Sequence, residues 1–219
     1  PQFIRQPELD VDGVRLFVAT AEGLFCFQST DYQGIESLDL VEALATKEFS
    51  ASAFGFSHVE EPLYFVCTNG QRDLCCARYG LPVYKRLRDL VADRVWQTTH
   101  LGGHRFAPNV LALPQGVLYG RVNPGEVAQF IEQVDEGRLS RQHVRGRSAF
   151  PPEAQVAEVL LDEEVLELIE CTEGRVVVRT EKGERSVGVE LGPPLDIIAS
   201  CGEESPKQAR PFSGRLAHL

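Results

Sequence analysis

The pattern of hydrophobic and polar positions divides the first third of the chain into short apolar runs separated by turn formers. Residues 14–20 and 24–28 are rich in aliphatic and aromatic side chains and flank a Glu22-Gly23 turn, which predicts two strands. A helix is predicted over about 37–46, because Ser37 is a candidate N-cap and the apolar residues Leu38, Val41 and Leu44 behind it follow helical spacing.

The middle third has the clearest pattern. Residues 63–66 form an apolar run between turn-forming segments and predict a buried strand, and residues 95–99 are strand-like. Helical spacing of apolar residues behind Pro82 predicts a helix over 82–93. Two further strands, 110–113 and 117–122, flank the hairpin signal Pro114-Gln115-Gly116. Asn123-Pro124-Gly125-Glu126 then resembles a capping box that opens a helix.

The order over 62–135 is therefore strand, helix, strand, loop, strand, strand, helix. A βαβ unit followed by ββα is the thioredoxin arrangement, with the loop at 100–109 in place of a middle helix. We expect an α/β fold with a thioredoxin-like core over 61–136, an N-terminal α/β extension over 1–60, and a C-terminal helix plus β-hairpin over 137–219. In that last segment, residues 152–168 are predicted to be helical and 175–180 and 185–191 to be strands, and the polar tail from Gly202 is predicted to be mobile at its end.

Composition narrows the function classes. The chain has 219 residues, 43% hydrophobic and 25% charged residues and a net charge of −10, which is typical of a globular protein and argues against broad nucleic-acid binding. No apolar run approaches a membrane span of about 18 residues, and the N-terminus lacks the features of a signal peptide. Two of the six cysteines are adjacent, so we favour metal or redox use in a reducing cytoplasm over a disulfide framework.

Cysteine and histidine residues gather within forty positions of the middle third. Cys67 and Cys76 flank a turn-forming loop, and His100 and His104 flank Gly102-Gly103. Both Cys67 and His100 follow strands that are parallel neighbours in the predicted fold. Because parallel strands end at the same edge of a sheet, the four donors are expected to converge there. Such a Cys2His2 set can hold one tetrahedral zinc ion or a [2Fe–2S] cluster, and the spacing does not separate these alternatives.

Three motifs occur in order and carry a resemblance: Phe65–Ala77 with its three cysteines, His100-Leu-Gly-Gly-His104-Arg-Phe-Ala, and Leu113-Pro-Gln-Gly-Val-Leu-Tyr-Gly-Arg121. Together they resemble the sucrase/ferredoxin-like family of thioredoxin-like [2Fe–2S] proteins, and Arg145-Gly146 extends the likeness. The resemblance implies that Cys67, Cys76, His100 and His104 bind a [2Fe–2S] cluster, and that Cys75 occupies a variable position and is not a ligand. It carries no expectation of sucrase activity.

Several alternatives remain open from the residues alone. Arg72, Asp73, Gly102, Gly103, Arg105 and Arg121 are candidates for supporting the ligands, with surface salt bridging as the competing interpretation of the charged ones. The Cys75-Cys76 pair could serve a thiol oxidoreductase, although it lacks the usual Cys-x-x-Cys spacing. Cys201 could be a spare thiol or could approach the centre.

The leading hypothesis is a one-electron carrier or redox sensor rather than an enzyme, with a redox partner protein and no nucleic-acid or membrane partner. The rival is a structural zinc protein that acts as an interaction module. Two thiolates and two neutral imidazoles make the oxidised cluster less negative than four thiolates, so we expect a potential nearer the Rieske range of ~−150 to +300 mV than the ~−400 mV of plant-type ferredoxins. Because imidazole ligands titrate, that potential is also expected to depend on pH.

Overall fold

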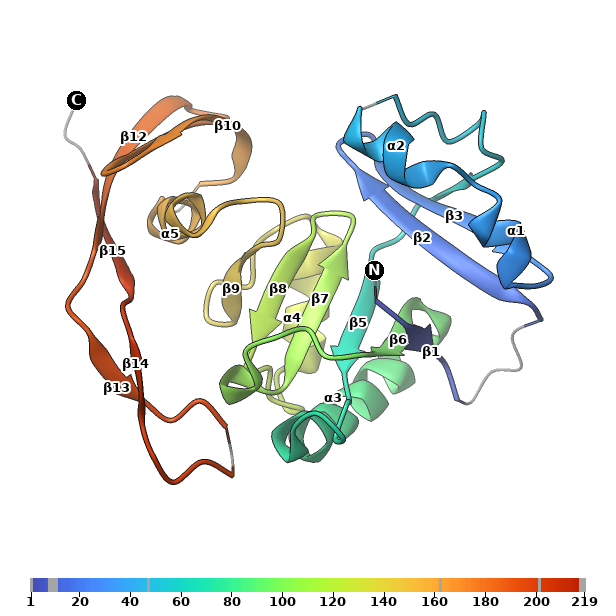
Figure 1. The fold of residues 1–219 in the computed structure, drawn as a ribbon, viewed down its shortest axis with the longest axis horizontal. Coiled ribbons are helices and arrows are strands. Elements are labelled where there is room, and N and C mark those ends of the chain that lie inside the picture. The colour runs from blue at the N-terminus through green and yellow to red at the C-terminus, as the bar shows by residue number, and fades with distance from the viewer. Residues whose placement is uncertain (1, 8–11, 47, 162, 201, 217–219) are drawn as a thin grey trace.

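A six-stranded mixed sheet forms the centre of the molecule (Figure 1). The computed structural model describes residues 2–7, 12–46, 48–161, 163–200 and 202–216. The strand order is β1-β6-β5-β7-β8-β9, with bounds β1 (Ile4–Arg5), β5 (Leu63–Cys67), β6 (Val95–Thr98), β7 (Asn109–Leu113), β8 (Val117–Gly120) and β9 (Val144–Arg147).

The predicted thioredoxin-like core is confirmed by the pairing of these strands. Strands β5 and β6 are parallel and are joined by α3 (Leu74–Val91), while β7 and β8 add on antiparallel and lead into α4 (Val127–Asp135). The helices pack their apolar faces on the sheet, and the shared core includes Tyr64, Val83, Leu87, Tyr119 and Phe130. The apolar face of each helix is thereby buried, which is the main source of helix stability in proteins.

Two helix boundaries in the core differ from the sequence prediction. Helix α3 begins eight residues earlier than expected and contains Pro82 in its interior, because the Asp73 side chain caps the helix by accepting from the backbone N–H of Cys75 at 2.8 Å. At α4 the predicted capping box is not formed. Asn123 instead accepts from the N–H of Gly125 at 2.9 Å in a turn before the helix, and Glu126 occupies the N-cap position.

The N-terminal segment forms a separate three-stranded sheet of β2 (Val14–Thr20), β3 (Gly23–Ser29) and β4 (Ser57–Val59). The two strands predicted around Glu22-Gly23 are confirmed. The helix predicted over 37–46 is present as the shorter α2 (Leu40–Ala45), but Ser37 is not its N-cap: Ser37 ends a preceding short helix, α1 (Tyr32–Glu36), which the sequence did not predict. Phe17 and Leu24 of this sheet pack against Phe65 and Trp96 of the central sheet.

The C-terminal segment is more extensive than the predicted helix and hairpin. Helix α5 (Pro152–Leu160) packs on a four-stranded antiparallel sheet of β10 (Val165–Thr172), β11 (Arg175–Thr180), β12 (Gly183–Leu191) and β15 (Phe212–Leu216). Residues 165–168, predicted to be helical, therefore belong to a strand. The tail is ordered in β14 (Lys207–Ala209), which pairs with β13 (Leu195–Ile197), and in β15, because backbone pairing with β12 compensates for its polar composition. Its last three residues lie outside the described part of the chain.

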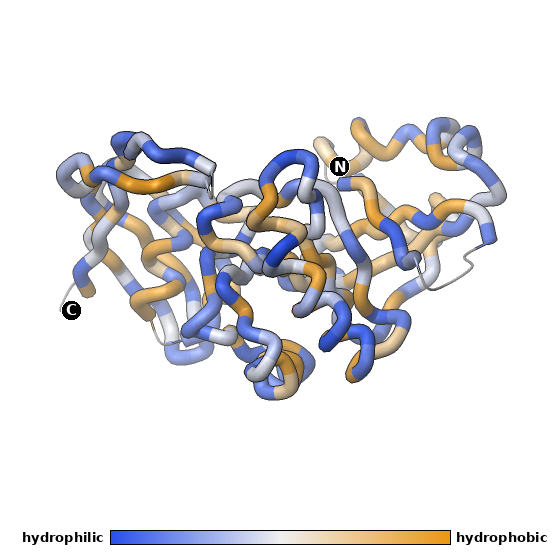
Figure 2. The backbone as a smooth tube through the Cα atoms, turned by 90° about the horizontal axis from the view of Figure 1, so that it is seen from below, coloured by the Kyte–Doolittle hydropathy of each residue, from blue (hydrophilic) through white to orange (hydrophobic). Residues whose placement is uncertain are grey.

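The segments before and after the core each add a strand to the central sheet. Strand β1 pairs with β6 and β9 pairs with β8, so the thioredoxin-like core is extended at both edges. The division at residues 60 and 136 stays a prediction. Figure 2 shows short hydrophobic stretches alternating with polar ones, and among the described residues no helix is both long and apolar enough to cross a membrane.

Candidate metal centre

The end of the parallel strand pair brings the predicted sulfur and nitrogen donors together. Cys67 is the last residue of β5 and pairs in register with Thr98, the last residue of β6. His100 follows two residues later. Cys76 lies in the first turn of α3, which starts beside the same edge. The convergence inferred from the strand ends is therefore present for these three residues.

Three donor atoms form a compact set. The Nδ1 atom of His100 lies 3.8 Å from the Sγ atom of Cys67 and 3.6 Å from that of Cys76. All three atoms lie within 4.8 Å of one another. Both cysteines are fully buried, whereas His100 is half-buried at the open side. The sulfurs thus form the inner wall of the site and the imidazole its outer wall.

His104 lies beside this set but not within it. Its ring centroid is 5.4 Å from that of His100. Its Nδ1 atom is buried and has no hydrogen-bond partner in the described residues, while its Nε2 atom lies 3.6 Å from Oδ2 of Asp73. A buried imidazole nitrogen without a partner is costly unless something else occupies its lone pair or proton. This unsatisfied nitrogen is a suitable fourth donor for an inorganic centre.

Two glycines allow the close approach of the elements that carry the donors. A Cβ atom on Gly80 of α3 would clash with the carbonyl oxygen of Cys67, so the helix can lie this close to the end of β5 only with glycine there. Gly103 has a φ of +60°, and a Cβ atom on it would clash with the guanidinium of Arg145. Gly102 also has a positive φ of +79°, which favours glycine.

The electrostatics of the protein alone oppose ionisation of the Cys76 thiol. Burial, followed by the neighbouring Cys67, raises the pKa of Cys76 to about 12. Burial also lowers the pKa of His100, assisted by the positive charge of His104 and Arg72. Thiolates and neutral imidazoles are the forms that bind metals. A bound cation would supply the positive charge that two adjacent buried thiolates need.

Asp73 connects the centre to the C-terminal segment. Ser200 donates a hydrogen bond to its Oδ2 atom, across 127 positions of the chain. Burial would raise the pKa of Asp73, but the hydrogen bonds from Ser200 and Cys75 and the charge of His104 outweigh it and lower the pKa. Sequence reasoning did not identify Ser200, because no local pattern marks a contact made over so long a separation.

Two of the other predicted supporting residues, Arg105 and Arg121, lie around Phe106, just beyond His104. The guanidinium carbons of Arg105 and Arg121 lie 4.3 and 5.3 Å from the Phe106 ring centroid. Arg72 is exposed, and its backbone N–H donates to Asn69. Arg145 was named only within the family motif, yet its Nη1 atom donates to the carbonyl of Gly102 at 3.2 Å and so holds the loop between the two histidines.

The adjacent residues Cys75 and Cys76 do not form a vicinal dithiol. Cys75 is disulfide-bonded, which departs from the expectation of reduced cysteines, whereas Cys76 is a free thiol. A redox pair made of Cys75 and Cys76 is therefore not formed. Cys26 and Cys171 are free as well, and Cys201 lies outside the described residues.

The donor set fits either a zinc ion or a [2Fe–2S] cluster. The distances between the donor atoms indicate which of them would bind the same metal ion. Ligands bound at about 2.0–2.3 Å to one tetrahedral ion lie roughly 3.5 Å from each other. The separations of 3.6 and 3.8 Å match that value. A [2Fe–2S] cluster would use the sulfurs on one iron and the imidazoles on the other, and the unpartnered Nδ1 of His104 provides the second nitrogen.

Comparison with known proteins agrees with the motifs. The chain is 30% identical over 118 residues to a protein named "Altered inheritance of mitochondria protein 32" from Meyerozyma guilliermondii, covering 48% of this chain and 42% of the relative. It is 29% identical to the protein of the same name from Clavispora lusitaniae, covering 47% and 41% respectively. The chain thus spans less than half the length of these curated relatives.

Among solved structures, a thioredoxin-like [2Fe–2S] ferredoxin from Aquifex aeolicus is similar at 21% identity and a TM-score of 0.36, over 42% of this chain and 97% of that one. The thioredoxin-like core assigned here rests on the strand order and pairing. Residues 2–146 match the sucrase/ferredoxin-like family along their whole length, and the chain is a member of that family.

Proposed function

We propose that this protein is an electron-transfer protein in which Cys67, Cys76, His100 and His104 hold a [2Fe–2S] cluster. One observation carries the proposal: two buried sulfurs and the Nδ1 of His100 lie within 4.8 Å of one another, beside the unpartnered buried Nδ1 of His104. Family membership supports the same donor set, because the resemblance implies these four ligands.

When bound, the cluster supplies the capacity to accept and release one electron. The residues of the chain determine how that capacity is used. The buried thiols exclude water from the inner side, and the half-buried histidines lie on the side from which a redox partner protein can approach. Two neutral imidazoles in place of two thiolates lower the negative charge, and we expect a potential near the Rieske range of ~−150 to +300 mV.

Metal and sulfide analysis after anaerobic purification tests the ligand set. We expect about two iron and two sulfide per chain, and an EPR signal after dithionite reduction. The variants C67S, C76S, H100A and H104A should each lose the wild-type spectrum, since each removes a donor.

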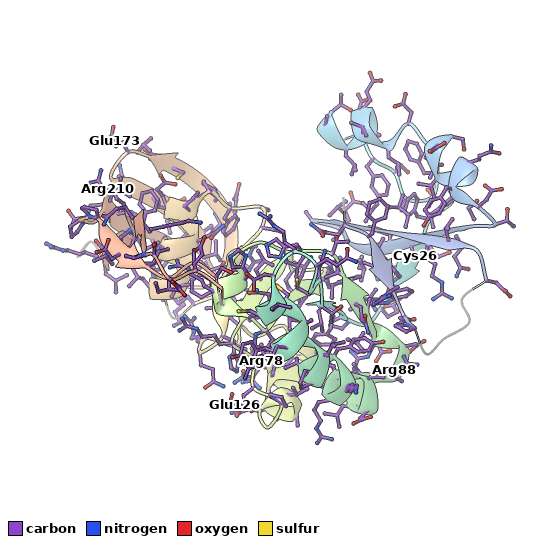
Figure 3. The ribbon with its side chains drawn as sticks, turned by 60° about the horizontal axis from the view of Figure 1, so that its bottom comes forward. Cys26, Arg78, Arg88, Glu126, Glu173 and Arg210 are labelled. Atoms are coloured by element: carbon purple, nitrogen blue, oxygen red, sulfur yellow. The ribbon has the colours of Figure 1, made fainter. Side chains whose placement is uncertain are left out.

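Matched controls separate ligand loss from general damage. The variant C26S removes a free thiol on the N-terminal sheet (Figure 3), and H58Q removes an exposed histidine. Both should retain iron and the EPR signal. Retention of the wild-type spectrum in C67S or C76S would overturn the proposal.

A structural zinc site is the second candidate, favoured by one observation. The His100 nitrogen lies as close to both sulfurs as ligands of a single tetrahedral ion do. In that case the purified protein would be colourless, contain one zinc and no sulfide, and unfold when the zinc is chelated. The same metal analysis distinguishes the two candidates.

A further inference from the structure

Three arginines surround one aromatic ring next to the metal centre. The guanidinium carbons of Arg105, Arg121 and Arg145 lie 4.3, 5.3 and 4.9 Å from the centroid of Phe106. The ring belongs to the 3₁₀ turn His104–Phe106 and so follows a proposed ligand by two residues. Cation–π attraction holds each guanidinium near the ring, but it does not neutralise their charge.

No carboxylate neutralises this arginine cluster. Among the described residues, none of the three arginines forms an ion pair with an aspartate or glutamate, although the chain has 32 acidic and 22 basic residues. Burial and the charge of Arg105 lower the pKa of Arg145, which shows that like charges are held together. In an acidic protein such a local concentration of positive charge attracts anions.

The cluster is held rigidly by the backbone. Nη1 of Arg145 donates to Oδ1 of Asn109 at 2.9 Å and to the carbonyl of Gly102 at 3.2 Å, which leaves its other donors, Nε and Nη2, without a hydrogen bond in the described residues. Arg121 has a φ of +57°, uncommon for a residue with a Cβ atom, and its N–H donates to the carbonyl of Phe106 at 2.7 Å. Strained backbone of this kind persists where the surroundings require it, often at functional sites.

A cavity opens beside two of the three arginines, Arg121 and Arg145, whereas Arg105 is not part of its lining. Its volume is about 350 Å³, and its lining includes Phe106, Arg121, Gln142, His143 and Arg145. His143 is 6% exposed and lies 3.1 Å from the amide nitrogen of Gln142, so the cavity wall offers further polar groups near the guanidiniums. Open guanidinium forks that face a polar cavity are suited to bidentate recognition of an oxyanion.

We propose that this cavity binds the phosphate group of a small molecule. The two guanidiniums that line the cavity, with Arg105 at the same aromatic ring, favour an anion of more than one negative charge, which a phosphate carries and a single carboxylate does not. The site lies outside the metal centre and does not depend on which metal is bound there. It is connected to that centre, because Arg145 donates to the Gly102 carbonyl between His100 and His104.

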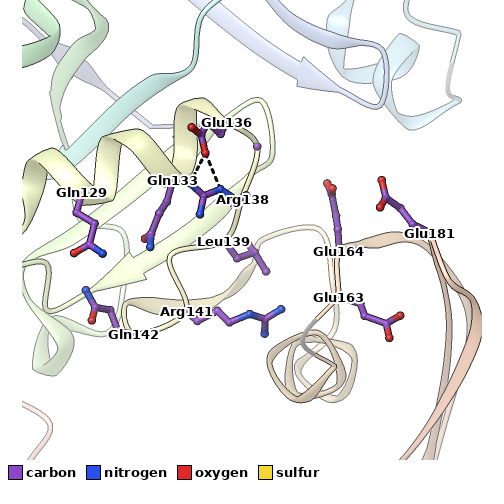
Figure 4. Close-up of a pocket in the computed structure, with 11 residues that line it drawn as sticks. Gln129, Gln133, Glu136, Arg138, Leu139, Arg141, Gln142, Glu163, Glu164 and Glu181 are labelled. Atoms are coloured by element: carbon purple, nitrogen blue, oxygen red, sulfur yellow. Dashed lines mark hydrogen bonds and ion pairs between the residues drawn. The ribbon is translucent and has the colours of Figure 1, made fainter.

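A second cavity, of about 630 Å³, lacks such a concentration of positive charge (Figure 4). Its lining mixes Gln133, Arg138, Glu163 and Glu181, and Arg138 already forms an ion pair with Glu136. Its lining carries charges of both signs, with Glu163, Glu164 and Glu181 gathered on one side (Figure 4). This lining favours neither an anionic nor a cationic ligand.

Isothermal titration calorimetry of the full chain with inorganic phosphate and pyrophosphate tests the proposal. Ionic strength is kept constant with sodium chloride, so that general screening does not imitate binding. We expect saturable binding to the wild type. In R121Q the affinity should fall about tenfold or more, because the change removes a charge-assisted hydrogen bond from the cavity wall.

The variant R78Q is a matched control. Arg78 is likewise exposed and lies 5.5 Å from the ring of Tyr79, but it belongs to α3 (Figure 3). It should bind phosphate as the wild type does. R121Q places no new strain on the backbone, since glutamine and arginine carry the same Cβ atom.

Four outcomes would overturn the assignment: no saturable heat with either phosphate, unchanged affinity in R121Q, an equal loss in R78Q, or equally tight binding of acetate. A tri-aspartate peptide is titrated in the same way. If the peptide binds and neither phosphate does, the ligand of the cavity is an acidic protein partner and not a phosphate group. The metal content of the same samples is measured in parallel, so failure of phosphate binding is distinguishable from failure of the cluster proposal.

Discussion

At the scale of single residues, Asp73 has the most connections around the metal centre. Its carboxylate caps α3 through the N–H of Cys75, accepts from Ser200 and faces Nε2 of His104. The side chain is 4% exposed. One buried carboxylate therefore positions the helix that carries Cys76 and also orients the imidazole next to it.

Replacing Asp73 separates its capping role from its charge. D73A should lower the free energy of unfolding by about 1 kcal/mol, because the helix loses its cap. D73N should remain close to wild type in unfolding, since asparagine caps equally well, while it removes the charge that faces His104. Urea denaturation of the three proteins checks this. Equal destabilisation by both variants would show that charge, rather than capping, is what Asp73 contributes.

Residue-level reasoning from the sequence predicted which candidate donors come together better than it predicted their surroundings. Cys67, Cys76 and His100 are recognisable because their types and spacings are unusual, and the structure brings these three together. Ser200 and the contact of Arg145 with Gly102 were not predictable. Both depend on where distant backbone segments come to lie, which local residue types do not encode.

At the scale of elements, a polar contact joins β5 to the ends of two helical segments. The Tyr64 hydroxyl donates to Asp135 at 2.6 Å, and Arg94 contacts both carboxylate oxygens of Asp135 at 2.9 Å. Asp135 ends α4, and Arg94 follows α3. This contact fixes both helices against one strand at the edge opposite to the metal centre.

The Tyr64 contact predicts a dependence of stability on alkaline pH. Burial, followed by the hydrogen bond to Asp135, raises the pKa of Tyr64. The unfolded chain, with a tyrosine pKa of about 10, loses this proton first, so the free energy of unfolding should fall as pH rises above about 10. In Y64F the fall should be shallower, although Tyr119, whose pKa is raised to about 12, still contributes to it.

Urea unfolding between pH 8 and pH 11 (roughly the range that brackets a free tyrosine) measures this effect. Y79F serves as the control, because Tyr79 is an exposed tyrosine on α3. It should retain the wild-type slope. A slope in Y64F as steep as in Y79F would show that Tyr64 does not keep its proton through folding.

At the scale of the whole molecule, the C-terminal sheet depends on its last strand. Strand β15 pairs with β12 along five residue pairs, and Gly214 lies directly against Leu160 and Val156 of α5. The cluster of apolar residues there is distinct from the core around α3 and α4. We therefore propose that this sheet can loosen while the thioredoxin-like core stays folded.

Deleting residues 207–219 tests that independence. The deletion removes β14 and β15 but keeps Ser200 and its contact with Asp73. Amide hydrogen exchange should become faster in β12 and α5 and remain unchanged in β5 and β6. Equally faster exchange in the central strands would mean that the chain unfolds as one cooperative unit.

Local sequence pattern was sufficient to predict the βαβ–ββα order, the strand positions of the core and the grouping of Cys67, Cys76 and His100. Hydrophobic periodicity and the spacing of Cys and His residues are properties of short segments, so they can be recognised in the sequence without knowledge of the fold. Only the tertiary structure decided where α3 begins, how the polar tail is paired, and that three arginines meet at Phe106 without a carboxylate. Each of these depends on contacts between segments far apart in the chain, whose free energy exceeds the local preferences that the sequence displays.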